Sequence, residues 1–169
     1  MPIVAGDIDY HLSGGAGNTD PSASLGGVIS TTQITDASLH NVFDVVSSAE
    51  ASAGDTEYRC IYVKNAHGSL TLQNAKVWIE TQTPSGDTSV EIALAGEGVN
   101  GTAETIANES TAPSGESFSA PASEGAGLTI GDIPAGQSQA IWIKRIVSAT
   151  ASAYSSDSVV IRVKGDTAA

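Results

Sequence analysis

The stretch that decides the fold is residues 54–72, GDTEYRCIYVKNAHGSLTL. It opens with a Gly-Asp turn, continues through YRCIYVKN, and breaks at a glycine before the next apolar run. Successive side chains of a strand point to opposite faces of its sheet. One face carries Tyr58, Cys60 and Tyr62. The other face carries Arg59, Ile61 and Val63. The pattern predicts a central strand that is entered through the Gly-Asp turn and ends at Asn65.

The composition favours short strands joined by polar loops. The chain has 169 residues, enough for one domain with a real core, and only 15% of them are charged and 5% aromatic. A helical bundle would need more Leu, Glu, Lys and Arg. The net charge of −12, with 7 basic residues, repels phosphates and anionic lipid. We therefore expect no nucleic-acid partner and no membrane partner.

The N-terminus MPIVAGDIDYHLSGG lacks the basic start and apolar run of a signal peptide. The single cysteine cannot form an internal disulfide, and no apolar run reaches membrane-spanning length. These features predict a protein that is made and folded in a cytoplasm.

Strand patterns recur at short intervals, and none of the periodic segments resembles an amphipathic helix. The candidate strands are residues 28–34, 41–47, 58–65, 74–83, 88–95, 139–147 and 158–165. We expect residues 74–95 to form a β-hairpin around the turn PSGD. The fold class predicted is all-β, an antiparallel β-sandwich that is immunoglobulin-like or jelly-roll-like.

The N-terminal region predicts an extended arm. Residues 1–27 combine the alternating stretch DIDYHL with a Gly- and Ser-rich segment, and residues 28–169 form a single sandwich domain. A long loop insert is expected at about 96–127, where apolar residues are few. Ile8, Tyr10 and Leu12 share one face of the first strand, which must pair with its own sheet or with a neighbouring chain.

The chemistry-bearing residues do not form a recognisable catalytic set. A nucleophilic Cys60 would need a histidine in reach, and the three histidines fall in the arm and in loops. The sequence contains no zinc cluster, no regular calcium loop, no nucleophile elbow and no phosphate loop. We expect Cys60 to be a buried core residue, and we expect no enzymatic activity, no cofactor and no metal.

Three larger side chains leave alternatives open. Trp78 and Trp142 lie opposite the Val/Ile faces of their strands. Each would fill a core or lie at a subunit interface, and an exposed sugar-binding platform is a third option. Arg59 is an isolated charge beside apolar neighbours, so it should pair with an acid at the end of the sheet or reach a neighbouring subunit.

Three stretches, YHLSGGAGNTDPSASLGGVIS, FDVVSSAEASAGDTEYRCIYVKN and DIPAGQSQAIWIKRIV…ASAYSSDSVVIRVKGD, resemble virion proteins of tailed bacteriophages. The resemblance covers roughly half of the chain. It implies a small, non-enzymatic β-rich component of the particle, made in the host cytoplasm and located in the virion. Capsid decoration, head–tail and tail proteins all use such modules.

The leading hypothesis from this resemblance is a capsid decoration (cement) protein that binds and stabilises the shell. The alternatives are a tail or baseplate component and a carbohydrate-binding adsorption module. The expected partners are the major capsid protein or other virion proteins, together with further copies of the chain in a homo-oligomer, for which a trimer is one option. The candidate interface residues are Ile8, Tyr10, Leu12, Arg59, Trp78 and Trp142.

Overall fold

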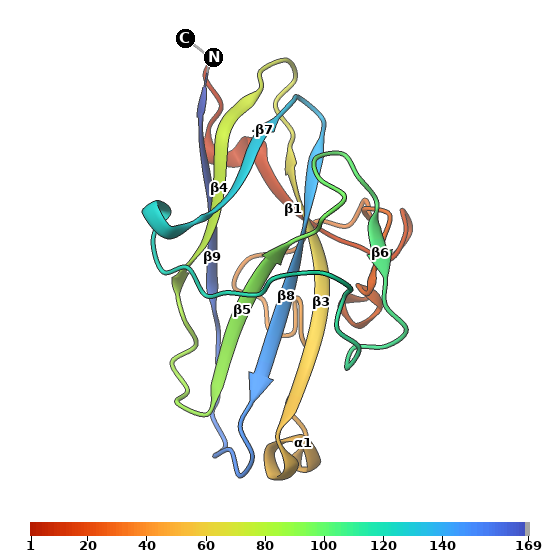
Figure 1. Ribbon diagram of the computed structural model, residues 1–169, viewed down its shortest axis with the longest axis vertical. Coiled ribbons are helices and arrows are strands. Elements are labelled where there is room, and N and C mark those ends of the chain that lie inside the picture. Colours follow the sequence, from red (N-terminus) through yellow and green to blue (C-terminus); the bar gives the residue numbers. More distant parts are fainter. Residues whose placement is uncertain (168–169) are drawn as a thin grey trace.

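The computed structural model describes residues 1–167, and in this part the chain is almost entirely antiparallel β (Figure 1). The last two residues of the predicted sandwich domain, 168 and 169, lie outside the described residues. One sheet has the strand order β1 (Ile8–Leu12), β3 (Asp55–Asn65), β8 (Ser138–Val147) and β5 (Thr88–Leu94). The second has the order β7 (Leu128–Ile133), β4 (Leu72–Thr81) and β9 (Val160–Thr167). The all-β, sandwich-like fold class is confirmed.

Short elements complete the described chain. Strands β2 (Gly26–Gly27) and β6 (Ala103–Thr105) pair with each other. Helix α1 (Ser48–Ala53) begins with a capping box, in which Ser47 accepts from the Glu50 N–H and Glu50 accepts from the Ser47 N–H. Three turns of 3-10 helix are η1 (Ala5–Asp7), η2 (Pro21–Ala23) and η3 (Glu124–Ala126).

The first core lies between the two sheets and is built by strand alternation. Ile61 and Val63 of β3 belong to the same buried cluster as Val77 and Ile79 of β4, and all four are nearly inaccessible. In the register of β3 and β8, Ile61 lies opposite Ile141, which joins this cluster. Burying each such side chain contributes about 1.5–3 kcal/mol to the free energy of unfolding.

A second core covers the outer face of the β1-β3-β8-β5 sheet. Cys60, Tyr62 and Trp142 point to this side and are buried against Ala103 and Ile106. The cover is made by the chain around β2 and by residues from the predicted 96–127 insert, which runs across the sheet in Figure 1. The insert has little regular structure, as expected, but it seals a core.

The extended N-terminal arm is not observed. Strand β1 pairs with β3 of the same chain, from Ile8 opposite Asn65 to Leu12 opposite Ile61. The Gly-rich segment after it is a compact loop rather than a flexible linker, since the Gly14 N–H donates to the Gly26 carbonyl at 2.8 Å and closes the loop. A Cβ on Gly26, whose φ is +94°, would lie 1.7 Å from the Glu104 carbonyl oxygen. The glycines permit close packing here, whereas the sequence pattern predicted a flexible segment.

The predicted hairpin over 74–95 is wrong, because β4 and β5 belong to different sheets. Strand β4 has β7 on one side and β9 on the other, so neither edge is free for β5. The connection instead crosses between layers and is held by Gln82. Its side-chain amide donates to the Val90 carbonyl at 2.8 Å, and its oxygen accepts from the Val90 N–H at 2.9 Å.

The two strands expected at 28–34 and 41–47 are also wrong. Residues 30–34 follow the outer edge of β1 with hydrogen bonds such as Leu12 N–H to the Thr32 carbonyl, but form only one isolated bridge, His11 to Gln33. Residues 41–47 hold no strand, although Val42 and Phe43 pack against the first core. The alternating apolar and polar residues of both segments belong to chain that covers the sandwich rather than to strands of its sheets.

The edge of β5 is closed by a loop in a similar way. Ile92 and Ser119 exchange two backbone hydrogen bonds, of 2.8 and 3.0 Å. Two residues further on, the Pro121 carbonyl accepts from the Ile79 N–H of β4 at 2.8 Å. One loop therefore ties the two sheets together and occupies donors that a free edge would offer to another chain.

We expect Tyr62→Phe to lower the free energy of unfolding by about 1–3 kcal/mol. The Tyr62 hydroxyl donates to the Gly27 carbonyl at 2.6 Å and accepts from the Ala103 N–H at 3.0 Å, so its loss leaves both groups unpaired at the second core. Urea unfolding followed by tryptophan fluorescence measures the change. Tyr154→Phe, at an exposed tyrosine, is the control and should change stability by less than about 0.5 kcal/mol. Equal effects of the two substitutions would contradict the role of the hydroxyl.

Candidate functional site

Arg59 lies on the face of β3 that points between the sheets and is completely inaccessible. Its Nη2 donates to the Glu109 carboxylate at 2.5 Å, and its Nη1 donates to the Tyr58 carbonyl at 3.1 Å. The Glu109 carbonyl also accepts from the Tyr58 N–H at 2.7 Å, which fixes the loop against the edge of β3. Arg59 thus pairs with an acid of its own chain, but this acid belongs to a loop beside the edge of β3 rather than to the end of the sheet.

A second ion pair lies beside it. Glu57 of β3 is opposite Arg145 of β8 in the register, and the Arg145 Nε donates to the Glu57 carboxylate at 2.5 Å. Glu57 is almost fully buried. Burial raises the pKa of Glu57 above the usual value, against the opposing influence of the nearby Arg145 guanidinium.

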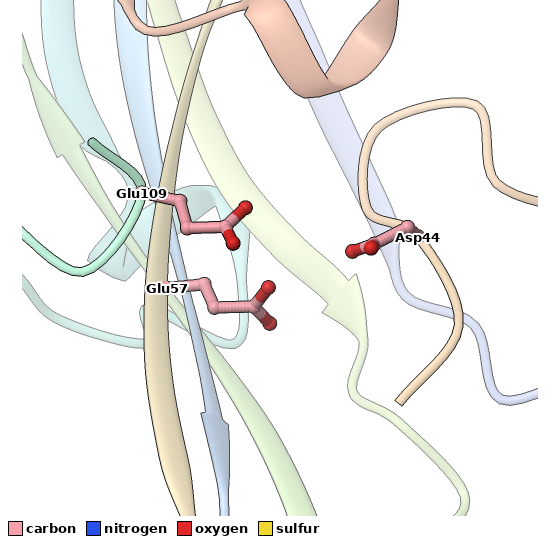
Figure 2. Close-up of side chains that lie close together, drawn as sticks. All are labelled: Asp44, Glu57 and Glu109. Atoms are coloured by element: carbon pink, nitrogen blue, oxygen red, sulfur yellow. The ribbon is translucent and has the colours of Figure 1, made fainter. Parts of the chain in front are cut away.

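Asp44 joins the two pairs from the opposite side. Its carboxylate lies 3.5 Å from Arg145 Nη2 and 3.9 Å from Arg59 Nη2, and its backbone carbonyl accepts from Arg145 Nη1 at 2.7 Å. The Phe43 ring stacks near both guanidiniums, with its centroid 4.8 Å from Arg145 Cζ and 5.4 Å from Arg59 Cζ. Figure 2 shows the Glu57 and Glu109 carboxylates projecting toward Asp44. We call these five charged residues the charged cluster.

The charged cluster is the one grouping in the described chain where three possible metal ligands converge. Carboxylate oxygens of Asp44, Glu57 and Glu109 all lie within 4.8 Å of one another, and such oxygens suit Ca²⁺ or Mg²⁺. Two guanidiniums already lie at ion-pair distance from the same oxygens. A cation would have to displace them, so the arrangement is suited to internal neutralisation rather than to metal binding.

Cys60 has the surroundings of a core residue. It is fully buried in the second core, and burial raises the pKa of its thiol far above the usual value. In the described residues no histidine nitrogen is hydrogen-bonded to it. His11 is buried and bonded through Nδ1 to the Ser30 carbonyl at 2.9 Å, while His67 accepts backbone N–H groups of its own loop. The arrangement does not activate a thiolate.

The two tryptophans lie on the outer faces of two different sheets. Trp142 is fully buried beside Cys60 in the second core. Trp78 alternates with the core residues Val77 and Ile79, lies opposite Arg162 of β9, and is only 6% exposed. Neither side chain offers the exposed ring face that a sugar platform requires.

The other predicted interface residues also have partners within the chain. Leu12 is buried, and Ile8 and Tyr10 are half-buried against the first core. Burial raises the pKa of Tyr10 to about 12, and a backbone hydrogen bond with Val163 of β9 partly opposes that shift. Contact of any of the six with another chain stays a prediction, and the buried ones would need the fold to rearrange first.

The sequence reasoning missed four members of the charged cluster. Glu57 is predictable from the sequence, because alternation in GDTEYRCIYVKN places it on the same face as Arg59. Arg145 required the register of β3 with β8. Asp44 and Glu109 are 65 residues apart in the chain, at loop positions without a local pattern.

Comparisons with known proteins identify no family for this chain. No protein-family model matches the chain. The curated proteins and the solved structures likewise give no significant match. Among the helices of residues 1–167, none is long and apolar enough to cross a membrane.

We expect Arg145→Met to lower the free energy of unfolding at neutral pH by about 3–5 kcal/mol, because it leaves the buried Glu57 carboxylate without its closest partner. The double substitution Arg145→Met with Glu57→Gln should recover part of the loss. The penalty of the single substitution should also shrink on acidification, since protonation of Glu57 removes the unpaired charge. Chemical unfolding at several pH values measures this. A double variant no more stable than Arg145→Met would contradict the assignment.

Cys60 should react with a thiol reagent at least about a thousandfold more slowly in the native protein than in the unfolded chain. The reason is that the thiol is inaccessible and its ionisation is suppressed by burial. Labelling with and without denaturant measures the ratio by mass spectrometry. Rapid native labelling, with the fold intact by circular dichroism, would restore the reactive-site interpretation.

Proposed function

We propose that the protein is a structural component of a bacteriophage virion, and more specifically a capsid decoration protein that binds and stabilises the shell. The observation that carries the proposal is the resemblance of three stretches to tailed-phage virion proteins. In the fold these stretches supply the second half of β1 and the loop after it, the segment from Phe43 through β3, strand β8 and most of β9. The resemblance therefore extends to both sheets.

The use of the polar side chains supports a structural role. The cysteine is sealed in a core, and the buried Arg59 and the partly buried Arg145 are engaged in ion pairs within the chain. The side-chain amide of Asn65 bonds the Leu70 and Ile133 carbonyls at 2.8 and 2.9 Å and holds the connection after β3. Groups that could perform chemistry instead hold loops to sheets, which suits a rigid binding module.

The first experiment locates the chain in particles. Particles assembled in the host cell are purified and labelled with gold-conjugated antibody against the protein. We expect label distributed over the shell. Label confined to the tail would favour the alternative of a tail or baseplate component, and particles free of the protein by mass spectrometry would overturn the proposal.

The second experiment tests stabilisation. Purified protein is added to particles assembled without it, and the temperature at which they release their genome is followed with a nucleic-acid dye. A decoration protein should raise this temperature, because many modest contacts repeated over a symmetric lattice sum to a large effect. Binding without any such rise would argue against the cement role.

Deleting residues 1–15 is an unsuitable test of shell binding. The deletion removes β1, exposing Ile61 and Val63 of β3 at the sheet edge. Lost incorporation would then report unfolding rather than a missing contact. The carbohydrate-binding alternative has no structural support, since it required an exposed Trp78 or Trp142.

A further inference from the structure

Residues 41–46 close one side of the first core without joining a sheet. We call this segment the strap. Within residues 1–167, no backbone-to-backbone hydrogen bond connects the strap to the rest of the protein. By contrast, the closing segments at β1 and β5 each make several such bonds. The strap is therefore held by side chains alone.

The attachment of the strap is concentrated at Arg145. This guanidinium binds the Asp44 carbonyl and carboxylate and lies against the Phe43 ring. Arg59 adds a longer contact to the Asp44 carboxylate. Val42 and Phe43 contribute packing against the first core, while Leu39 and Val45 on either side are largely exposed.

The charges around the attachment do not balance. Glu57 and Arg59 come from β3, Arg145 from β8, Glu109 from the loop at the β3 edge, and Asp44 from the strap. Three carboxylates share two guanidiniums, so one negative charge is in excess when all are ionised. Asp44 makes the longest ion pairs, at 3.5 and 3.9 Å, against 2.5 Å between Arg59 and Glu109.

We propose that the strap is a pH-sensitive closure whose hold on the sandwich is set by Glu57. When Glu57 is ionised, its carboxylate competes with the Asp44 carboxylate for Arg145. The two carboxylates also repel each other, so the strap opens more often. When Glu57 is neutral, two carboxylates face two guanidiniums, Arg145 is left to Asp44, and the strap stays closed. Opening withdraws Val42 and Phe43 from the core and exposes the buried charges beneath them.

The burial of Glu57 places this change above the ordinary glutamate range. Since burial raises its pKa, the folded protein holds the proton more tightly than the unfolded chain does. The contribution of Glu57 to stability therefore increases as the pH falls through its folded pKa and is complete below its unfolded pKa. The strap should open less often as the pH falls through this range. Ordinary ion pairs behave in the opposite way, because acid protonates their carboxylates and weakens them.

The test is thiol–disulfide exchange at the strap, measured in a protein that carries Val42→Cys, because Val42 packs against the first core and becomes fully accessible only on opening, while Cys60 is buried. The rates are corrected for the intrinsic effect of pH with an unstructured peptide of the same sequence, and this protein without further substitution is the wild type of the comparison. For the wild type we expect exchange at a pH below the folded pKa of Glu57 to be roughly threefold or more slower than at a pH above it. Glu57→Gln keeps the shape of the side chain without its charge. It should show the slow exchange at both pH values.

Two further variants make the result specific. Asp44→Asn removes the strap's own charge, so exchange should be fast and nearly independent of pH. Glu91→Gln removes the partner of Lys144 in a comparable pair, 2.9 Å long, elsewhere on the same sheet, and should behave as the wild type in the strap.

The opposite role for Glu57 predicts the opposite sign. If its charge were needed to hold Arg145 in place for Asp44, Glu57→Gln would speed exchange of the strap, and the wild type would loosen on acidification. Either result overturns the proposal, as does exchange that is the same in Glu57→Gln and the wild type at both pH values.

Discussion

Strand β3 carries apolar side chains on both faces, and each face needs its own cover. On the inner side Ile61 and Val63 are covered by the β7-β4-β9 sheet. On the outer side Cys60 and Tyr62 are covered by segments with little regular structure around β2 and β6. Because a sheet face left in water would forfeit this burial energy, the long Gly- and Ser-rich stretches must fold back over the sheet rather than extend from it.

The charged cluster is a consequence of the same strand. Toward its N-terminal end the inner face of β3 changes from Ile61 to Arg59 and then Glu57, so the gap between the sheets receives charge where it would otherwise receive apolar side chains. Buried charges are tolerated only when they are paired and hydrogen-bonded. Arginine suits this position, because its planar guanidinium can bind carboxylates and still lie against the Phe43 ring.

The alternation in the sequence was sufficient to predict both faces of β3, the burial of Cys60 and the all-β class. Those features depend on neighbours along the chain. The hairpin over 74–95 failed because the choice of partner for β4 is made by β9, more than seventy residues later. The arm failed for a related reason: a glycine that allows free motion and one that allows close packing, such as Gly26, are identical in sequence.

The closures of the sandwich differ in what holds them, and this orders their stability. The loop at β5 and the segment along β1 use backbone hydrogen bonds, which share in the cooperative unfolding of the sheets. The strap relies mainly on Arg145, the Phe43 ring and the exposed Asp44 carboxylate, with a longer contact to Arg59. Local opening follows the segments with the fewest such bonds, so its free energy should be lowest at the strap. The excess carboxylate lies beneath this segment, so its charge affects the part of the fold that opens at the lowest free energy.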